Sequence, residues 1–311
     1  MSAHEPVELG CQDQVRDLVL IHGWGMNGAV WEALASALPA SLRLHPIELP
    51  GHGERTLHPP CDGGSGTLEA WADACLESAP RRAVWLGWSL GGLVALAAAL
   101  RTQTEGTQAE GTQAEGTPER IQGLILMTAT PRFVQAPDWP AAMRPQTLTQ
   151  FHDGLLADPA GTLSRFLALQ VRGSDQAREA LRRLRHDLAT RPPPDPSALA
   201  LGLDLLREQD LRPALSRLRV PSIWLFGSHD TLVPAAVASE IPRLLPGARA
   251  RIHTIAGAAH APFLSHPTEI GETIGAFLEG LTQVQPPFMG SDRENLNRDR
   301  ASNQPVPSEA T

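Results

Sequence analysis

The sequence predicts an α/β fold in which a mostly parallel sheet carries helices on both faces. Short apolar runs alternate with segments of helical spacing over residues 18–127 and again after residue 210, an order that is typical of parallel sheets. The apolar runs are nearly uninterrupted, as expected for strands that are buried on both faces. With 311 residues, 42% of them hydrophobic, the chain is long enough to build one large core.

Each strand and helix of this pattern can be assigned in chain order. The expected strands are apolar runs, most of them closed by turn-forming or charged residues: residues 18–21, 42–49, 83–86, 121–127, 222–226 and 250–255. The expected helices between and after them have apolar residues on one face: residues 31–38, 68–78, 90–100, 235–245 and 267–281. Strands that alternate with helices in this way should lie parallel to one another.

The alternation stops between residues 131 and 210, where no convincing strand occurs. Helical segments follow one another there instead, at residues 140–156, 161–170, 175–189 and 197–208. We therefore expect a helical cap (131–210) that is inserted into an α/β core, and the core consists of residues 1–130 and 211–282.

Two segments are expected to lack stable structure. Residues 102–117 contain a tandem Glu-Gly-Thr-Gln-Ala unit. Such low-complexity repeats bury little surface, which predicts a flexible repeat loop. Residues 283–311 are polar and contain several prolines, which predicts a disordered tail.

Composition narrows the classes of function. A net charge of −8 argues against binding nucleic acid or an anionic membrane over the whole surface. The N-terminal residues lack a secretory signal pattern, and the most apolar stretch, residues 90–100, is too short to cross a bilayer. The three cysteines are odd in number and do not match a metal-ligand pattern. We therefore expect a cytoplasmic protein with no cofactor, no metal and no disulfide framework, and we expect it to be a monomer.

The strongest chemical signal is Gly-Trp-Ser-Leu-Gly at residues 87–91, between an expected strand and an expected helix. Gly-x-Ser-x-Gly in this context predicts a nucleophile elbow, a strained turn that raises the serine above the sheet. The turn needs small neighbours because the backbone doubles back on itself. The helix that follows points its N-terminal N–H groups at developing negative charge. Ser89 is therefore the predicted nucleophile; the alternative is a bystander serine in a glycine-rich turn.

A serine nucleophile needs a histidine base, and the base needs an acid that orients it. In this fold the chain order is serine, acid, histidine. Asp230 and His260 follow the last two expected strands, at the edge where open α/β sheets bind ligands. They are the predicted acid and base, and Asp204 is the alternative acid. Other nearby histidines lie within a strand, beside the acid or at a helix start: His253, His229 and His266.

The reaction also requires hydrogen-bond donors for an oxyanion. One donor is predicted to be the backbone N–H of Leu90, directly after the nucleophile. The second donor should come from a loop after an early strand, and His-Gly-Trp-Gly at residues 22–25 occupies that loop. The backbone N–H of Trp24 is the predicted second donor. The alternative is a simple turn that ends the strand.

Five segments together resemble one family, the methyl esterases of biotin synthesis. The resemblance spans roughly residues 18–281 and rests on residues 22–25, 49–53, 85–95, 165–170 and 258–267. Such enzymes have the α/β-hydrolase fold and hydrolyse the methyl ester of pimeloyl-acyl-carrier protein by a Ser-His-Asp acyl-enzyme mechanism. The resemblance therefore implies that Ser89 attacks the ester, that His260 acts as base and then as acid, and that Asp230 orients His260.

The resemblance also implies a set of substrate-binding residues. They are Trp24, Ser89, Leu90, Phe166, Leu167, Ala168, Leu169, Gln170 and His260. The apolar members of the 166–170 segment suit a seven-carbon chain that is mostly methylene. The alternative is that this segment is ordinary core of the insertion.

Docking of an acidic carrier protein is implied as well. Similar family members use arginines near Arg165, Arg178 and Arg182 for this purpose, and Arg178, Arg182 and Arg185 share one helix face. Gly161 occupies a position where another arginine is expected. The alternative for each of these arginines is a plain solvated basic face.

Three other functions remain open at this point. The first is a general short-chain carboxylesterase, and the second is a carbon–carbon hydrolase that uses the same triad. The third is a non-catalytic binding module, which the predicted triad and oxyanion loop disfavour. Dehalogenases and epoxide hydrolases carry an aspartate at the nucleophile position, so Ser89 argues against both.

Overall fold

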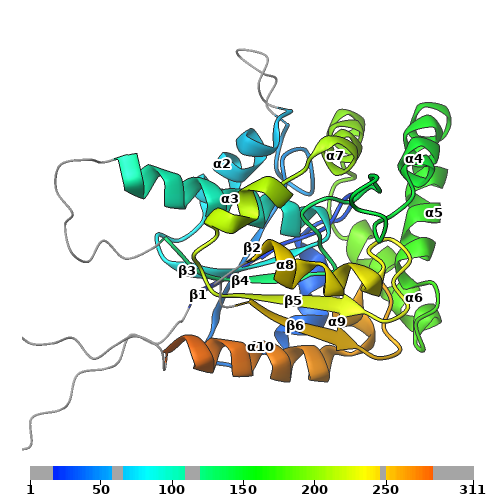
Figure 1. The fold of residues 1–311 in the computed structure, drawn as a ribbon. Helices are drawn as coiled ribbons and strands as arrows, with labels where there is room; N and C mark the ends of the chain where they lie inside the picture. The colour runs from blue at the N-terminus through cyan, green and yellow to red at the C-terminus, as the bar shows by residue number, and fades with distance from the viewer. Residues whose placement is uncertain (1–16, 58–65, 109–119, 246–249, 283–311) are drawn as a thin grey trace, which may run out of the picture.

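The computed structural model describes residues 17–57, 66–108, 120–245 and 250–282. Within these residues six strands form one sheet in the order β2-β1-β3-β4-β5-β6, and every neighbouring pair is parallel. The strands are β1 (Asp17–Ile21), β2 (Arg43–Ile47), β3 (Ala83–Trp88), β4 (Ile121–Met127), β5 (Ser222–Gly227) and β6 (Ala250–Ile255). The predicted α/β fold with a parallel sheet is thereby confirmed (Figure 1).

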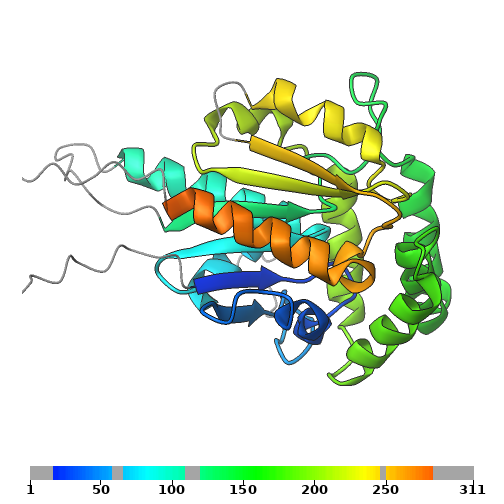
Figure 2. The same cartoon turned by 90° about the horizontal axis from the view of Figure 1, so that it is seen from below.

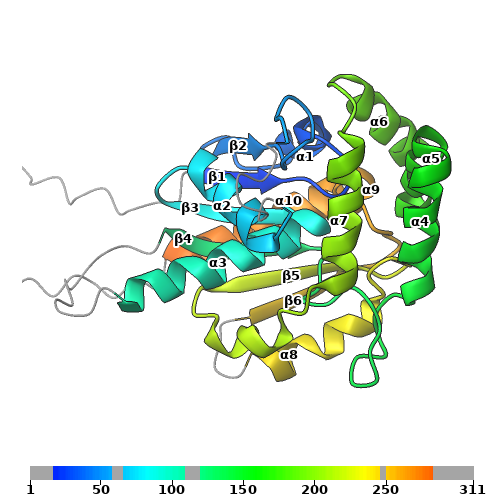
Figure 3. The same ribbon diagram turned by 90° about the horizontal axis from the view of Figure 1, so that it is seen from above.

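Helices cover both faces of the sheet (Figures 2 and 3). On one face lie α2 (Leu68–Ser78), α3 (Leu90–Gln108) and α8 (Ile241–Leu244), and on the other lie α1 (Glu32–Ala35), α9 (Pro262–Ser265) and α10 (Pro267–Thr282). The inner strands β3 and β5 are buried along their whole length. Two buried apolar clusters, one on each face, therefore form the core.

The helix after Ser89 is longer than the sequence predicted. The prediction ended it at residue 100 and began a flexible loop at residue 102, but α3 continues to Gln108. The expectation of a loop is therefore wrong for residues 102–108. An ion pair of 2.7 Å between Arg101 Nε and Asp73 Oδ1 ties this part of α3 to α2, and such a tertiary contact cannot be read from repeat composition. The later repeat residues and the expected tail lie outside the described residues.

The helix expected over residues 235–245 is also interrupted. The structure has a 3-10 helix, η3 (Ala235–Ser239), followed by the short α8. Pro242 lies in the first turn of α8. Because proline has no backbone N–H and its ring clashes with the preceding turn, one helix cannot run through this position.

Four helices between β4 and β5 form a separate layer at the carboxyl ends of the strands (Figure 3). We call them the α4–α7 layer: α4 (Pro145–Ala157), α5 (Pro159–Val171), α6 (Ala177–Ala189) and α7 (Pro196–Glu208). The carboxylates of Asp158 and Asp195 cap α5 and α7, and a proline follows each of them. These start signals explain why the predicted helices form here.

The two ends of the α4–α7 layer are joined where the chain leaves the sheet and returns to it. The backbone N–H of Leu211 donates to Pro131 O at 2.9 Å. The guanidinium of Arg132 donates to the carboxylate of Asp210 at 2.9 Å. This connection holds the layer over the same edge of the sheet from both of its ends. No helix in the described part of the chain is long and apolar enough to cross a membrane.

Candidate active site

Ser89 occupies the turn between β3 and α3. Its φ of 55° lies in the left-handed region, which is strained for a residue with a side chain. A Cβ at Gly91 would lie 2.3 Å from Ile21 O, and a Cβ at Gly87 would lie 2.3 Å from Gly91 O. No residue larger than glycine fits at either position. The structure thus gives Ser89 the elbow geometry that the motif indicates.

Asp230 and His260 are brought together from the loops after β5 and β6. His260 Nδ1 lies 2.7 Å from Asp230 Oδ2, and both residues are buried. Asp230 Oδ1 accepts the backbone N–H groups of Leu232 and Val233 at 2.8 and 2.9 Å. Nδ1 therefore carries the proton that faces the carboxylate, and Nε2 presents its lone pair. Nε2 is buried and has no hydrogen-bond partner among the described residues.

The alternative acid lies elsewhere. Asp204 is on α7, where its carboxylate accepts a hydrogen bond from Arg207 at 2.8 Å. The carboxylate that faces His260 is that of Asp230.

The loop that carries His260 is fixed from three sides. The backbone carbonyl of His260 accepts the indole N–H of Trp88 and the hydroxyl of Thr128, each at 2.8 Å. The backbone N–H of His260 donates to Gln170 O at 2.9 Å. Trp88 directly precedes Ser89, so one residue bounds the turn and holds the histidine loop. Thr128 has a φ of 41°, and it could not be predicted because no motif marks a threonine at the end of β4.

The loop after β1 borders Ser89. A Cβ at Gly23 would lie 3.3 Å from Ser89 Cβ. The backbone N–H groups of Trp24 and Leu90 donate to no other described residue. A Cβ at Gly202 in α7 would lie 2.7 Å from Trp24 Cδ1 and 3.2 Å from Leu90 Cδ2. The α4–α7 layer therefore covers both side chains of the predicted oxyanion pair.

The five residues predicted to line an acyl channel divide into two groups. Phe166 packs its ring edge-on against Trp24 with centroids 4.6 Å apart. Gln170 is buried, its carbonyl bonds to the backbone N–H of His260, and its side-chain Nε2 has no partner among the described residues. Leu167 is buried, whereas Leu169 is half-buried and Ala168 is exposed. The structure thus brings Phe166 and Gln170, but not Ala168, to the loops around Ser89.

The predicted docking arginines lie on the outer surface of α5 and α6. Arg165 donates to Thr162 Oγ1 at 2.6 Å. Arg182 makes two hydrogen bonds to the Glu179 carboxylate, which raise the pKa of this guanidinium further. Arg178 is exposed and makes no ion pair with another described residue. Of the three, Arg178 presents the least compensated charge.

A mostly apolar pocket of 530 Å³ lies between α5, α6 and the chain before α7. Its apolar lining includes Leu163, Leu167 and Leu188, and its lining also includes Arg185 and Arg191. A Cβ at Gly25 would lie 2.6 Å from Leu163 Cδ1, so Leu163 separates this pocket from the loop after β1. Neither arginine was singled out as a pocket residue from the sequence.

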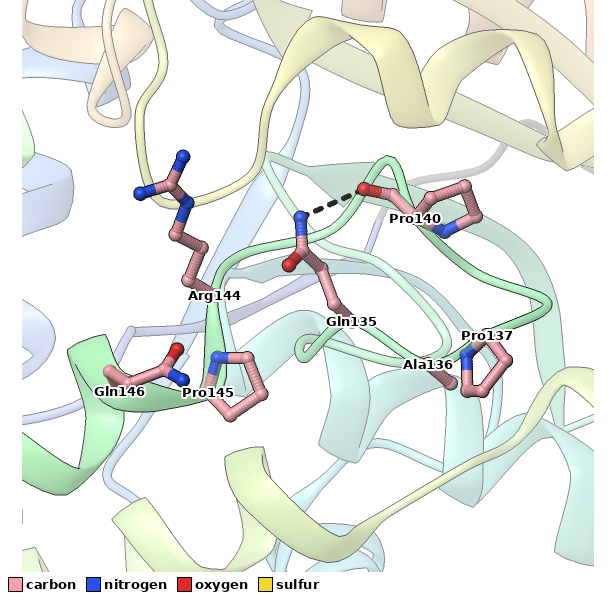
Figure 4. A pocket seen from close by; sticks show the side chains of 7 residues that line it. All are labelled: Gln135, Ala136, Pro137, Pro140, Arg144, Pro145 and Gln146. Atoms are coloured by element: carbon pink, nitrogen blue, oxygen red, sulfur yellow. Dashed lines mark hydrogen bonds between the residues drawn. The ribbon is translucent and has the colours of Figure 1, made fainter.

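A second hollow lies in the segment that links β4 to α4 (Figure 4). It has a volume of 740 Å³ and is lined by Gln135, Ala136, Pro137, Pro140, Arg144, Pro145 and Gln146. The side chain of Gln135 closes one side by donating to Pro140 O at 2.9 Å. The hollow contains no residue predicted from the sequence to take part in chemistry.

Solved structures of several hydrolases share this fold. An esterase from Exiguobacterium antarcticum superposes with a TM-score of 0.69 at 20% identity, covering 86% of this chain and 92% of that one. The enol-lactonase from Burkholderia xenovorans LB400 superposes with a TM-score of 0.66 at 20% identity, covering 85% and 92%. At this level of identity the likeness concerns the fold alone.

Sequence comparison is more specific. The family model described as the alpha/beta hydrolase family matches residues 18–273. A pimeloyl-acyl-carrier-protein methyl ester esterase from Photobacterium profundum is 40% identical over 86% of this chain and 96% of its own length. An enzyme of the same name from Xanthomonas oryzae pv. oryzae is 42% identical over 84% and 94%. The chain therefore belongs to the alpha/beta hydrolase family and, within it, to the family of pimeloyl-acyl-carrier-protein methyl ester esterases.

Proposed function

We propose that this chain hydrolyses the methyl ester of a pimeloyl group carried on an acyl-carrier protein, with release of methanol. The observation that carries the proposal is the buried Asp230–His260 pair together with the strained turn at Ser89. His260 Nε2 has no hydrogen-bond partner among the described residues. The names of relatives that are about 40% identical over most of the chain support the choice of ester.

The reaction begins with acylation of Ser89. Its Oγ forms a bond to the ester carbonyl carbon while His260 Nε2 removes the hydroxyl proton. The Asp230 carboxylate stabilises the imidazolium through Nδ1. Negative charge develops on the carbonyl oxygen, and the N–H groups of Trp24 and Leu90 are the donors for it. The bond from the carbonyl carbon to the methoxy oxygen then breaks, and methanol leaves with the proton from His260.

Deacylation reverses these roles with water. His260 Nε2 removes a proton from the water, whose oxygen attacks the acyl carbonyl carbon. The bond to Ser89 Oγ breaks, and Oγ takes the proton back from His260. The products are the free pimeloyl carboxylate on its carrier and the regenerated enzyme.

The α4–α7 layer acts as a cap that binds the acyl chain. Phe166 contacts Trp24, and Gln170 bonds to the backbone of His260, so the α5 segment touches both loops that flank Ser89. An apolar ring next to the donor loop suits a methylene chain. The buried amide of Gln170, which has no described partner, is available to a polar group of the substrate.

The outer surface of α5 and α6 binds the carrier protein. Arg165, Arg178 and Arg182 are exposed there, and an acidic carrier complements their charge. The 530 Å³ pocket lies between the same two helices and contains Arg185 and Arg191 beside an apolar lining. It is a suitable entry for the phosphate-bearing arm of the carrier, because guanidinium groups bind phosphate and Leu163 adjoins the donor loop.

The test compares two substrates with the purified full chain. Methyl pimeloyl-carrier protein is followed by the loss of the ester methyl group in mass spectrometry, and p-nitrophenyl butyrate is followed by absorbance. We expect a much higher kcat/KM on the carrier substrate and no turnover of either substrate by Ser89→Ala. An equal or lower value on the carrier substrate would favour a general carboxylesterase. Inactivity on both esters would overturn the proposal and leave a carbon–carbon hydrolase as the next candidate.

A further inference from the structure

Two buried histidines next to the active site have no part in the proposed mechanism. His22 lies in the loop after β1, which also carries Trp24, and His52 lies in the loop after β2. Both side chains are fully buried, and their ring centroids are 5.3 Å apart. Buried polar groups are normally hydrogen-bonded, so the partners of both imidazole rings must be identified.

Each of the two rings makes a contact from its own loop to the other loop. His52 Nε2 accepts the backbone N–H of Gly25 at 3.3 Å, from the second loop to the first. His22 Nε2 faces the backbone N–H of Leu49 at 3.1 Å and the Glu48 carboxylate at 3.0 Å, from the first loop to the second. In its neutral form His22 accepts from Leu49, and in its protonated form it donates to Glu48. It bridges the loops in either form.

The hydrogen bonds of His52 define its tautomer. Nδ1 lies 3.0 Å from Pro50 O and must donate to it, so Nε2 keeps the lone pair that accepts from Gly25. Burial lowers the pKa of His52 to about 3, and the charge of His22 acts in the same direction. The lone pair on Nε2 is therefore present throughout the neutral and weakly acidic range.

The bond to Gly25 bears directly on the oxyanion donor. Gly25 follows Trp24, so its N–H belongs to the peptide that ends the Trp24 residue. Gly25 has a φ of +70°, and a Cβ there would clash with Leu163, so glycine is required and supplies no side chain to hold the loop. The backbone of this flexible residue is held by His52, while the Trp24 indole N–H is held by Leu199 O at 2.8 Å.

We propose that His52 is a positioning residue, which fixes the backbone of Trp24 and Gly25 so that the Trp24 N–H is aimed at the developing oxyanion. The inference rests on the proposed function, because it needs an acyl-transfer reaction at Ser89. A donor held in place before reaction stabilises the transition state more than the bound substrate. Loss of the His52–Gly25 bond should therefore lower kcat while KM stays nearly constant.

The experiment uses two amide variants of the full chain. In His52→Asn the side-chain NH2 can reach Pro50 O, as Nδ1 does, but the amide is too short to reach Gly25. In His52→Gln the amide oxygen can reach the Nε2 position and accept from Gly25. Because both variants bury a neutral amide, they are matched for polarity. His253→Gln, on the edge strand β6, is a control away from the active site.

We expect kcat on p-nitrophenyl butyrate to fall at least about tenfold in His52→Asn, a fraction of the loss seen when an oxyanion donor is removed. His52→Gln should stay within about threefold of the wild type. Affinity for a boronic acid, which forms a tetrahedral adduct with the nucleophilic serine, should weaken in parallel with kcat. A residue that only stabilises the fold would shift the melting temperature and leave kcat per folded molecule and boronate affinity unchanged.

The outcomes separate the inference from the function beneath it. If the wild type hydrolyses both the carrier ester and p-nitrophenyl butyrate, and the two variants share one kcat and one boronate affinity, the positioning role is overturned and the proposed function stands. If the wild type cleaves neither the simple ester nor the carrier ester, the proposed function and this inference are both overturned.

Discussion

The inner and outer surfaces of the α4–α7 layer differ in what their residues contact. Inward, Phe166 packs on Trp24 and Gln170 O accepts from His260, so these groups are buried and held. Outward, Arg178 on α6 is exposed and makes no ion pair with another described residue. The inner contacts around Trp24 and His260 are formed in the free chain, apart from the side-chain Nε2 of Gln170, which has no partner among the described residues. Substitutions inside should change turnover of every ester, and substitutions outside should change only that of the carrier-bound one.

The largest expected effect concerns the buried acid of the inner region. Asp230→Asn should lower kcat by about 10³–10⁴-fold on both substrates. If the amide oxygen keeps the Leu232 and Val233 bonds, its NH2 faces His260 Nδ1 as a donor and imposes the wrong tautomer, and the neutral amide cannot stabilise the imidazolium. Its neutral side chain also accepts less strongly from Leu232 and Val233. Steady-state kinetics with p-nitrophenyl butyrate and with the carrier ester measures the loss. A drop on only one substrate would contradict the division between the surfaces.

The next effect tests the contact of α7 with the oxyanion pair. Gly202→Ala should lower kcat by about tenfold on both substrates, because the new methyl group would lie 2.7 Å from Trp24 Cδ1 and must displace a buried ring. The matched control is Gly275→Ala in α10, where the nearest atom, Pro39 Cγ, is 3.9 Å away. The control should keep its kcat and gain slightly in stability from helix propensity. Equal kcat values for the two variants would show that the contact of α7 with Trp24 does not affect turnover.

A selective effect of similar size, confined to one substrate, is expected on the outer surface. Arg178→Glu should raise KM for the carrier ester by about tenfold, and the increase should shrink at high salt. Turnover of p-nitrophenyl butyrate should not change. Arg217→Glu is the control, since Arg217 is also exposed but lies on the 3-10 helix Arg212–Arg217, which packs beside α3 and α8. Comparable KM values for both variants would indicate a general charge effect without a docking surface.

The sequence was sufficient for the parts of the site that local patterns encode. Ser89 lies in a Gly-x-Ser-x-Gly motif, whose glycines indicate a strained turn. Asp230 and His260 each follow an apolar strand. The bonds that hold these residues were not predicted, because Thr128 and Trp88 reach His260 O across more than a hundred residues of chain. Such contacts arise from the register of neighbouring strands and leave no short-range spacing.

The same reasoning explains the errors in the fold. α3 contacts α2 through an ion pair between Arg101 and Asp73, which belong to different helices. Helix spacing and repeat composition describe only one segment at a time, so they placed the end too early. The break before α8 follows from Pro242, whose missing N–H the apolar periodicity of residues 235–245 does not reveal.

The last expected effect is thermodynamic and concerns His52, whose pKa burial lowers to about 3 in the folded chain. As pH falls through about 6.5, the ordinary pKa of histidine, His52 binds a proton in the unfolded chain but stays neutral in the folded chain. Stability from the neutral ring is thus complete above pH 6.5 and is lost progressively as pH falls toward 3.

Between pH 7 and pH 5 the wild type should lose on the order of 2 kcal/mol more unfolding free energy than His52→Gln, which has no proton to bind there. Urea unfolding of both proteins at the two pH values measures this difference. Because His22, Glu48 and Asp195, the other groups that act on His52, are present in both proteins, their contributions largely cancel. Parallel losses in the two proteins would mean that the folded chain admits the proton, and the bond from Gly25 would then be broken by mild acid.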